Sequence, residues 1–128
     1  MMHFIHKYGS PNYFYQWSGT WLKILSALTL ILMALGLYWA LIISPPDYQQ
    51  SETVRIMYIH VPSAWMSMFT YVVMASAGVV AMIWRIKVAE IVVAQSAIIG
   101  ASFTLLALVT GMLWGKPMWG AYWVWDAR

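Results

Sequence analysis

The sequence WLKILSALTLILMALGLYWALII, residues 21–43, decides the fold class of this protein. Its one charged side chain, Lys23, lies near the start of the stretch. Crossing a bilayer hydrocarbon core about 30 Å thick takes roughly 20 apolar helical residues. Trp21 and Trp39 lie near the two ends, where indole rings favour the membrane–water boundary. Residues 21–43 are therefore predicted to form a transmembrane helix that ends before Pro45.

Two further apolar stretches, residues 62–84 and 91–114, are long enough to cross the membrane in the same way. The whole chain is 62% hydrophobic and only 9% charged, whereas about a quarter of the residues of a soluble domain are charged. The expected fold is an all-α integral membrane protein with three transmembrane helices. Residues 1–128 then form a single membrane domain.

Positive charges give the expected topology. They lie in the N-terminal segment and in the turn between the second and third spans, as Lys7, Lys23, Arg85 and Lys87. The positive-inside rule places both regions in the cytoplasm. Residues 1–20, which are rich in aromatic side chains, are then a cytoplasmic interfacial segment. Loop 44–61 and the tail 114–128 share the opposite, periplasmic face.

The tail has the sequence WGKPMWGAYWVWDAR, with four tryptophans interrupted by glycines and a proline. Glycine and proline disfavour a core helix, so the tail is expected to leave the helix near Trp114 as an external segment. An aromatic belt that anchors the chain is one interpretation, and a flat surface that receives a planar ligand is the other. A helical tail would place Trp119 and Trp123 on one side. An extended tail would instead pair Trp123 with Trp125.

His60 is expected where the loop returns to the membrane, on the same face as the tail. A histidine at a boundary can simply hydrogen-bond a lipid headgroup or a carbonyl. It is also a common axial ligand of haem iron. Arg55 and Arg128 are predicted on the same face, where guanidinium suits either ligand carboxylates or headgroup phosphates. Asp126 is expected to orient an indole N–H or Arg128.

Composition excludes several classes of protein. The chain has no cysteine, which excludes disulfides, iron–sulfur ligation, thiolate zinc sites and a C-x-x-C-H haem attachment site. The net charge of +3 comes without a basic cluster, which favours contact with lipid over nucleic acid. We find no catalytic nucleophile motif, and expect a protein that is not an enzyme.

Three stretches carry a family resemblance. The tail resembles the tryptophan-rich WWD signature of the haem-handling proteins of cytochrome c maturation. Asp126 is followed by Ala127 rather than by proline, which favours the haem exporter protein C (CcmC) family within that group. The stretches PDYQQ (46–50) and RIMYIHVPSAW (55–65) resemble that family's first external loop and second helix, and residues 102–114 resemble its third helix.

The resemblance implies non-covalent binding of b-type haem at the periplasmic face of an inner membrane. It also implies presentation of haem to the chaperone CcmE, and assembly with the CcmA/CcmB ABC transporter and CcmD. The implied iron ligand is His60. The implied haem platform consists of Trp114, Trp119, Trp123, Trp125 and Asp126. Separately from the resemblance, we expect Arg55 and Arg128 to contact the haem propionates or a partner protein.

Family members are longer and continue into three more helices with another histidine. The chain is therefore expected to be the N-terminal half of a six-helix bundle, and to bind haem stably only when the other half is supplied. The alternative is a structural membrane subunit whose tryptophans only grip the interface. Haem-dependent absorbance that is lost in His60→Ala would distinguish the two.

Overall fold

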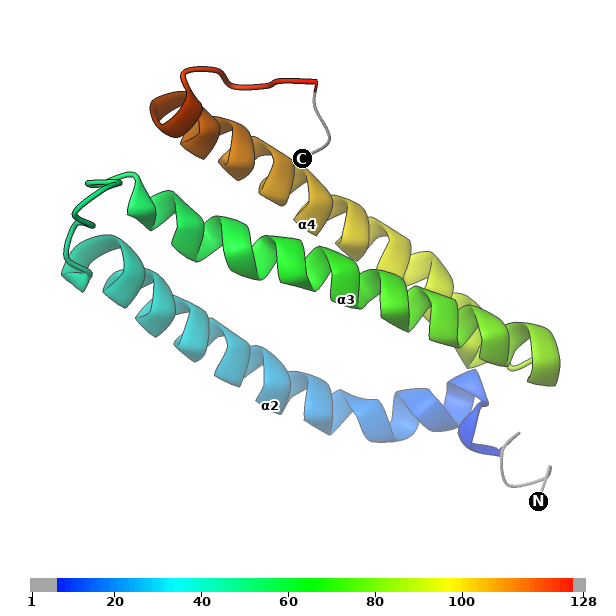
Figure 1. Ribbon diagram of the computed structural model, residues 1–128. Coiled ribbons are helices and arrows are strands. Elements are labelled where there is room, and N and C mark those ends of the chain that lie inside the picture. The colour runs from blue at the N-terminus through cyan, green and yellow to red at the C-terminus, as the bar shows by residue number, and fades with distance from the viewer. Residues whose placement is uncertain (1–6, 126–128) are drawn as a thin grey trace.

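The structure, a computed structural model, describes residues 7–125 and consists of three long helices (Figure 1). Helix α2 spans Pro11–Tyr38 and continues into the π-helix η1, Trp39–Ile43. Helices α3 (Val54–Trp84) and α4 (Lys87–Trp119) follow, and no β-strand is present between residues 7 and 125. Each of the three helical segments is long and apolar enough to cross a membrane. The predicted fold class is confirmed.

The first span is longer than residues 21–43, because helix begins at Pro11 and runs to Ile43 over 33 residues. At 1.5 Å per residue its length is about 50 Å, which exceeds a hydrocarbon core of about 30 Å. Ser10 is the N-cap, and its Oγ accepts a hydrogen bond from the Tyr13 N–H at 3.4 Å. Proline suits the first helical turn. Residues 11–20 are thus part of the helix and not a separate segment.

The end of the first span is held by a side chain from the next helix. Pro45 has no N–H, so it cannot donate to the carbonyl of Leu41 as an α-helix would require. The Arg55 guanidinium donates to that carbonyl instead, through Nη1. Arg55 Nε also pairs with Glu52 Oε2 at 2.5 Å. Arg55 therefore joins the start of α3 to the end of η1.

The external loop is shorter than predicted, because α3 begins at Val54 and not near Pro62. Asp47 closes the loop: its Oδ1 accepts backbone N–H bonds from Gln49 and Gln50, both at 2.8 Å. Since this turn takes so few residues, the stretch 54–61 is free to form two helical turns. Pro62 then lies inside α3.

Helices α3 and α4 pack closely through small side chains. A Cβ atom added at Gly100 would lie 3.1 Å from Thr70 Cγ2, and the hydroxyls of Ser67 and Thr104 are 2.6 Å apart across the interface. The buried residues of this pair are Ser63, Thr70, Ala89, Ser96, Gly100, Thr110 and Gly115. Small residues allow such close approach of helices in lipid. By contrast, α2 has no buried residue.

Candidate ligand-binding cavity

The tail folds back over the end of α4. The helix continues through Gly115 and Pro117 to Trp119, so the prediction that it ends at Trp114 was wrong by about one turn. Pro117 lies in the last turn of the helix, so only a few helical residues follow it and the proline disrupts little of the helix. Gly120 ends the helix in the left-handed conformation, with φ of 82°, which glycine adopts without steric cost. Residues 121–125, which we name the strap, then turn back along α4 (Figure 1).

The strap encloses a cavity of about 630 Å³ against α3 and α4. Ligand-binding cavities in proteins commonly hold 300–1,000 Å³. Its lining is mostly apolar and aromatic: Met57, His60, Val61, Ala107, Leu108, Gly111, Met112, Trp114, Gly115, Trp119, Ala121, Tyr122, Trp123, Val124 and Trp125. Among the described residues, the lining contains no Asp, Glu, Lys or Arg. The cavity therefore suits the apolar body of a ligand whose charged groups stay outside.

His60 projects from α3 and is held by two groups of α4. Its Nδ1 lies 2.9 Å from the Ala107 carbonyl oxygen and 3.2 Å from Thr110 Oγ1. A carbonyl oxygen can only accept, so Nδ1 carries the proton in this hydrogen bond. When the ring is neutral, this leaves a lone pair on Nε2, the arrangement found in metal-binding histidines whose other nitrogen donates to a backbone carbonyl.

Gly111 gives the imidazole its space. A Cβ atom added there would lie 3.0 Å from His60 Cε1 and 3.4 Å from Nδ1. The ring therefore rests directly on the α4 backbone, with its orientation fixed by the glycine beneath it and by Ala107 beside it. A fixed ring orientation is what an axial ligand requires.

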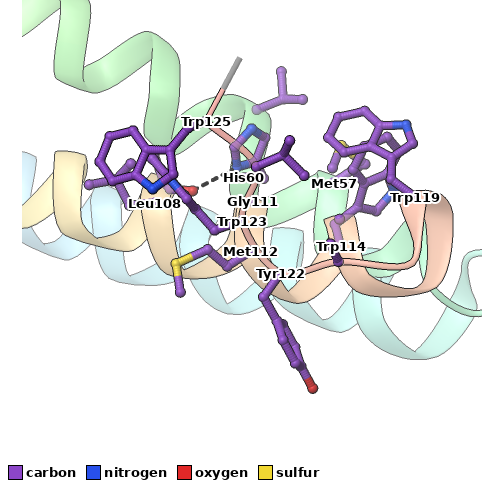
Figure 2. Close-up of a pocket in the computed structure, with 15 residues that line it drawn as sticks. Met57, His60, Leu108, Gly111, Met112, Trp114, Trp119, Tyr122, Trp123 and Trp125 are labelled. Atoms are coloured by element: carbon purple, nitrogen blue, oxygen red, sulfur yellow. Dashed lines mark hydrogen bonds between the residues drawn. The ribbon is translucent and has the colours of Figure 1, made fainter. Parts of the chain in front are cut away.

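The four tryptophans form two edge-to-face pairs. Trp114 and Trp119 have ring centroids 4.9 Å apart at 86°, and Trp123 and Trp125 are 5.6 Å apart at 77°. Figure 2 shows His60 between the two pairs in its view. The strap is not helical, and the Trp123–Trp125 contact agrees with the extended alternative. Trp125 is 91% exposed and Trp119 60% exposed, so indole faces remain open at the rim.

The structure brings together five of the predicted site residues, which all line the cavity: His60, Trp114, Trp119, Trp123 and Trp125. Arg55 is not among the lining residues. It bonds Leu41 and Glu52 instead, and its predicted contact with a ligand stays a prediction. Asp126 and Arg128 lie outside the described residues.

Sequence reasoning missed several residues of the cavity and its surroundings. Met57 lies one helical turn before His60, and only the unexpected helical start of 54–61 places both on one face. Leu108 and Met112 are four residues apart on α4 and resemble ordinary lipid-facing positions. Gln50 belongs to a recognisable loop stretch, but its contact is visible only in space: its Oε1 accepts from Trp114 Nε1–H at 2.9 Å.

The potential metal ligands of the cavity suit a metal that is already coordinated by a macrocycle. Within residues 7–125 no group of three or more His, Cys, Asp or Glu side chains could hold a bare metal ion. One imidazole nitrogen beside apolar and indole surfaces can instead ligate the metal of a flat, largely apolar ring. The residues present therefore fit a metalloporphyrin.

Together, the fold and the cavity define a multi-pass helical membrane protein with a histidine- and tryptophan-lined cavity at one end of its helices. The family model described as heme exporter protein C (CcmC) matches residues 4–128. This chain belongs to that family.

Three relatives illustrate the similarity. The chain is 48% identical to heme exporter protein C of Haemophilus influenzae over 128 residues, which cover 100% of this chain and 52% of the relative. It is 50% identical to the Bradyrhizobium diazoefficiens protein of the same name over 119 residues, 93% of this chain and 45% of the relative. Identity to the Escherichia coli protein is 44% over 124 residues, 97% of this chain and 51% of the relative. The chain thus spans about half the length of these curated relatives.

Proposed function

We propose that this protein binds haem non-covalently in the cavity under the strap and presents it for c-type cytochrome maturation. The observation that carries the proposal is the hydrogen bond from His60 Nδ1 to Ala107, 2.9 Å long, which leaves Nε2 as a ligand atom on an apolar, tryptophan-lined wall. The names of the relatives, heme exporter protein C, support the same ligand.

The shape of the site supports transient holding over permanent burial. The chain has no cysteine to attach a haem vinyl group. The strap leaves Trp125 and Trp119 largely exposed, so one edge of a bound ring would stay accessible to a partner. His60 is the one histidine between residues 7 and 125, so any second histidine ligand comes from outside that range. The proposed role is to hold and hand over haem, with no bond made or broken in the porphyrin.

We further propose the direction and the recipients of this transfer. The cavity lies at the end of the helices opposite Arg85 and Lys87, so the positive-inside rule puts it at the periplasmic face. The receiving protein is then the haem chaperone CcmE, and the membrane assembly includes CcmA, CcmB and CcmD, as the family resemblance implies. Copurification from membranes, followed by haem transfer from the loaded protein to purified CcmE, tests these partners.

Hemin titration in detergent micelles, with the other half of the six-helix bundle supplied, tests the binding itself. We expect a Soret band that is lost in His60→Gly and regained when free imidazole is added, because imidazole can occupy the vacated ligand position. His3→Ala is the matched control and should leave the band unchanged. If the unsubstituted protein shows no Soret shift at all, the tryptophans only anchor the chain and the proposal fails.

A further inference from the structure

Lys116 lies in the last turn of α4, outside the cavity lining, and makes two side-chain contacts with the residues that follow. Its Nζ donates to the carbonyl of Gly120 at 3.0 Å, and the ammonium lies 5.3 Å from the centre of the Tyr122 ring. Its own carbonyl accepts the Gly120 N–H, also at 3.0 Å. One residue thus holds both the N–H and the carbonyl of the glycine at which the chain reverses direction.

The reversal is tight, so the conformation of Gly120 decides where the strap goes. A Cβ atom added at Gly115 would lie only 3.3 Å from the Ala121 carbonyl oxygen, which shows how closely the strap returns over α4. A Cβ atom added at Gly120 would meet nothing within 4 Å. Glycine has wide conformational freedom, and here Lys116 bonds both its N–H and its carbonyl.

We propose that Lys116 is a positioning residue that fastens the strap, so that Trp123 and Trp125 face the side of the cavity that carries His60. This inference rests on the proposed function, because its consequence is a haem site assembled before haem arrives. Lys116 acts through Gly120 and Tyr122 and does not touch the ligand. Figure 2 agrees, since Tyr122 points away from His60. Preorganisation of a loop raises affinity by removing the cost of ordering it on binding.

Hemin affinity of the full-length protein gives the first test. In Lys116→Met, which keeps the length of the side chain and removes the charge, we expect Kd to rise about fivefold to tenfold, because one hydrogen bond and one exposed cation–π contact are each modest. Lys116→Arg should restore binding, since guanidinium can donate to the carbonyl and stack on the tyrosine. Lys23→Met, in α2 and outside the cavity lining, is the control and should bind as the unsubstituted protein does.

Haem dimethyl ester, which has no free carboxylates, separates positioning from direct contact. A positioning role predicts the same loss of affinity in Lys116→Met for haem and for its dimethyl ester. A loss confined to haem would mean that Lys116 pairs with a propionate, and would overturn the proposal. Tyr122→Leu should weaken binding, and combining it with Lys116→Met should add little, because the two side chains act as one unit.

Spin labels report on the strap without any ligand. The chain has no cysteine, so labels at Val124→Cys on the strap and Met68→Cys on α3 are specific. We expect a narrow distribution of the distance between the two labels when Lys116 is unsubstituted and in Lys116→Arg, and a broad distribution in Lys116→Met. Equal distributions in all three would refute the inference even if haem binds, whereas absence of haem binding in the parent would refute only the proposed function.

Discussion

Replacing Gly111 by alanine should weaken haem ligation while leaving the fold intact. The added Cβ would lie 3.0 Å from His60 Cε1, where ordinary contacts begin near 3.4 Å. The imidazole must therefore move by a few tenths of an ångström. That movement works against the 2.9 Å hydrogen bond from Nδ1 to the Ala107 carbonyl, which orients the ring.

The magnitude follows from this single hydrogen bond. A net contribution of about 1 kcal/mol is typical, so losing the ring's orientation should raise the Kd for haem roughly fivefold. Alanine is also more favourable than glycine inside a helix by about 1 kcal/mol. This gain offsets the loss of stability that the weakened hydrogen bond causes. We therefore expect a clear loss of affinity with little change in resistance to unfolding, and Gly111→Val should lose more.

Hemin titration and SDS unfolding in micelles, run on the same samples, measure the two quantities separately. Gly78→Ala is the matched control, because it also replaces a helical glycine but nothing lies within 4 Å of the added atom. It should leave haem affinity unchanged. If Gly111→Ala binds haem as tightly as Gly78→Ala, the imidazole does not rest on the α4 backbone and its orientation has another cause.

Three other features of the structure can be tested by substitution or fusion. Gln50→Leu should lower the stability of the protein by about 1–2 kcal/mol, since it leaves the Trp114 indole N–H without its acceptor. Tryptophan fluorescence during unfolding measures this change, with Gln49→Leu as the control. Equal unfolding midpoints for the two variants would contradict the prediction. Gly100→Val should force α3 and α4 apart at Thr70 and cost about 1–3 kcal/mol in SDS unfolding, whereas Gly36→Val, which has open space around it, should cost less. Alkaline phosphatase should be active when it is inserted after Gln50 or fused after Arg128, and inactive when it is inserted in the 85–87 turn. Activity only in the turn would reverse the proposed topology.

The three spans were predictable because hydropathy over some twenty residues is a strong signal that tertiary contacts rarely override. The helix ends were harder to predict. By its residue type Pro62 suggests a helix start, yet the Asp47 turn closes the loop earlier and places Pro62 inside α3. Pro117 suggests a break, yet the chain reverses only where Gly120 provides a left-handed residue.

The candidate site was predictable where residue type indicates chemistry, and less so where geometry decides. His60 and the tryptophans stand out by type, and the structure places them on one cavity. Arg55 also stands out by type, but the donor missing at Pro45 gives it a structural contact that sequence spacing does not reveal. Gly111 and Lys116 matter only through their neighbours in space, so the sequence offered no signal for them.

The close pairing of α3 and α4 also bears on how the chain enters the bilayer. The Ser67 hydroxyl bonds that of Thr104, and His60 bonds the α4 backbone, so α3 carries polar groups that α4 satisfies. Exposing such groups singly to hydrocarbon is costly. Because only Arg85 and Ile86 separate these helices, they are suited to leave the insertion machinery together as a helical hairpin. The first helix, which has no buried residue, can partition into lipid alone.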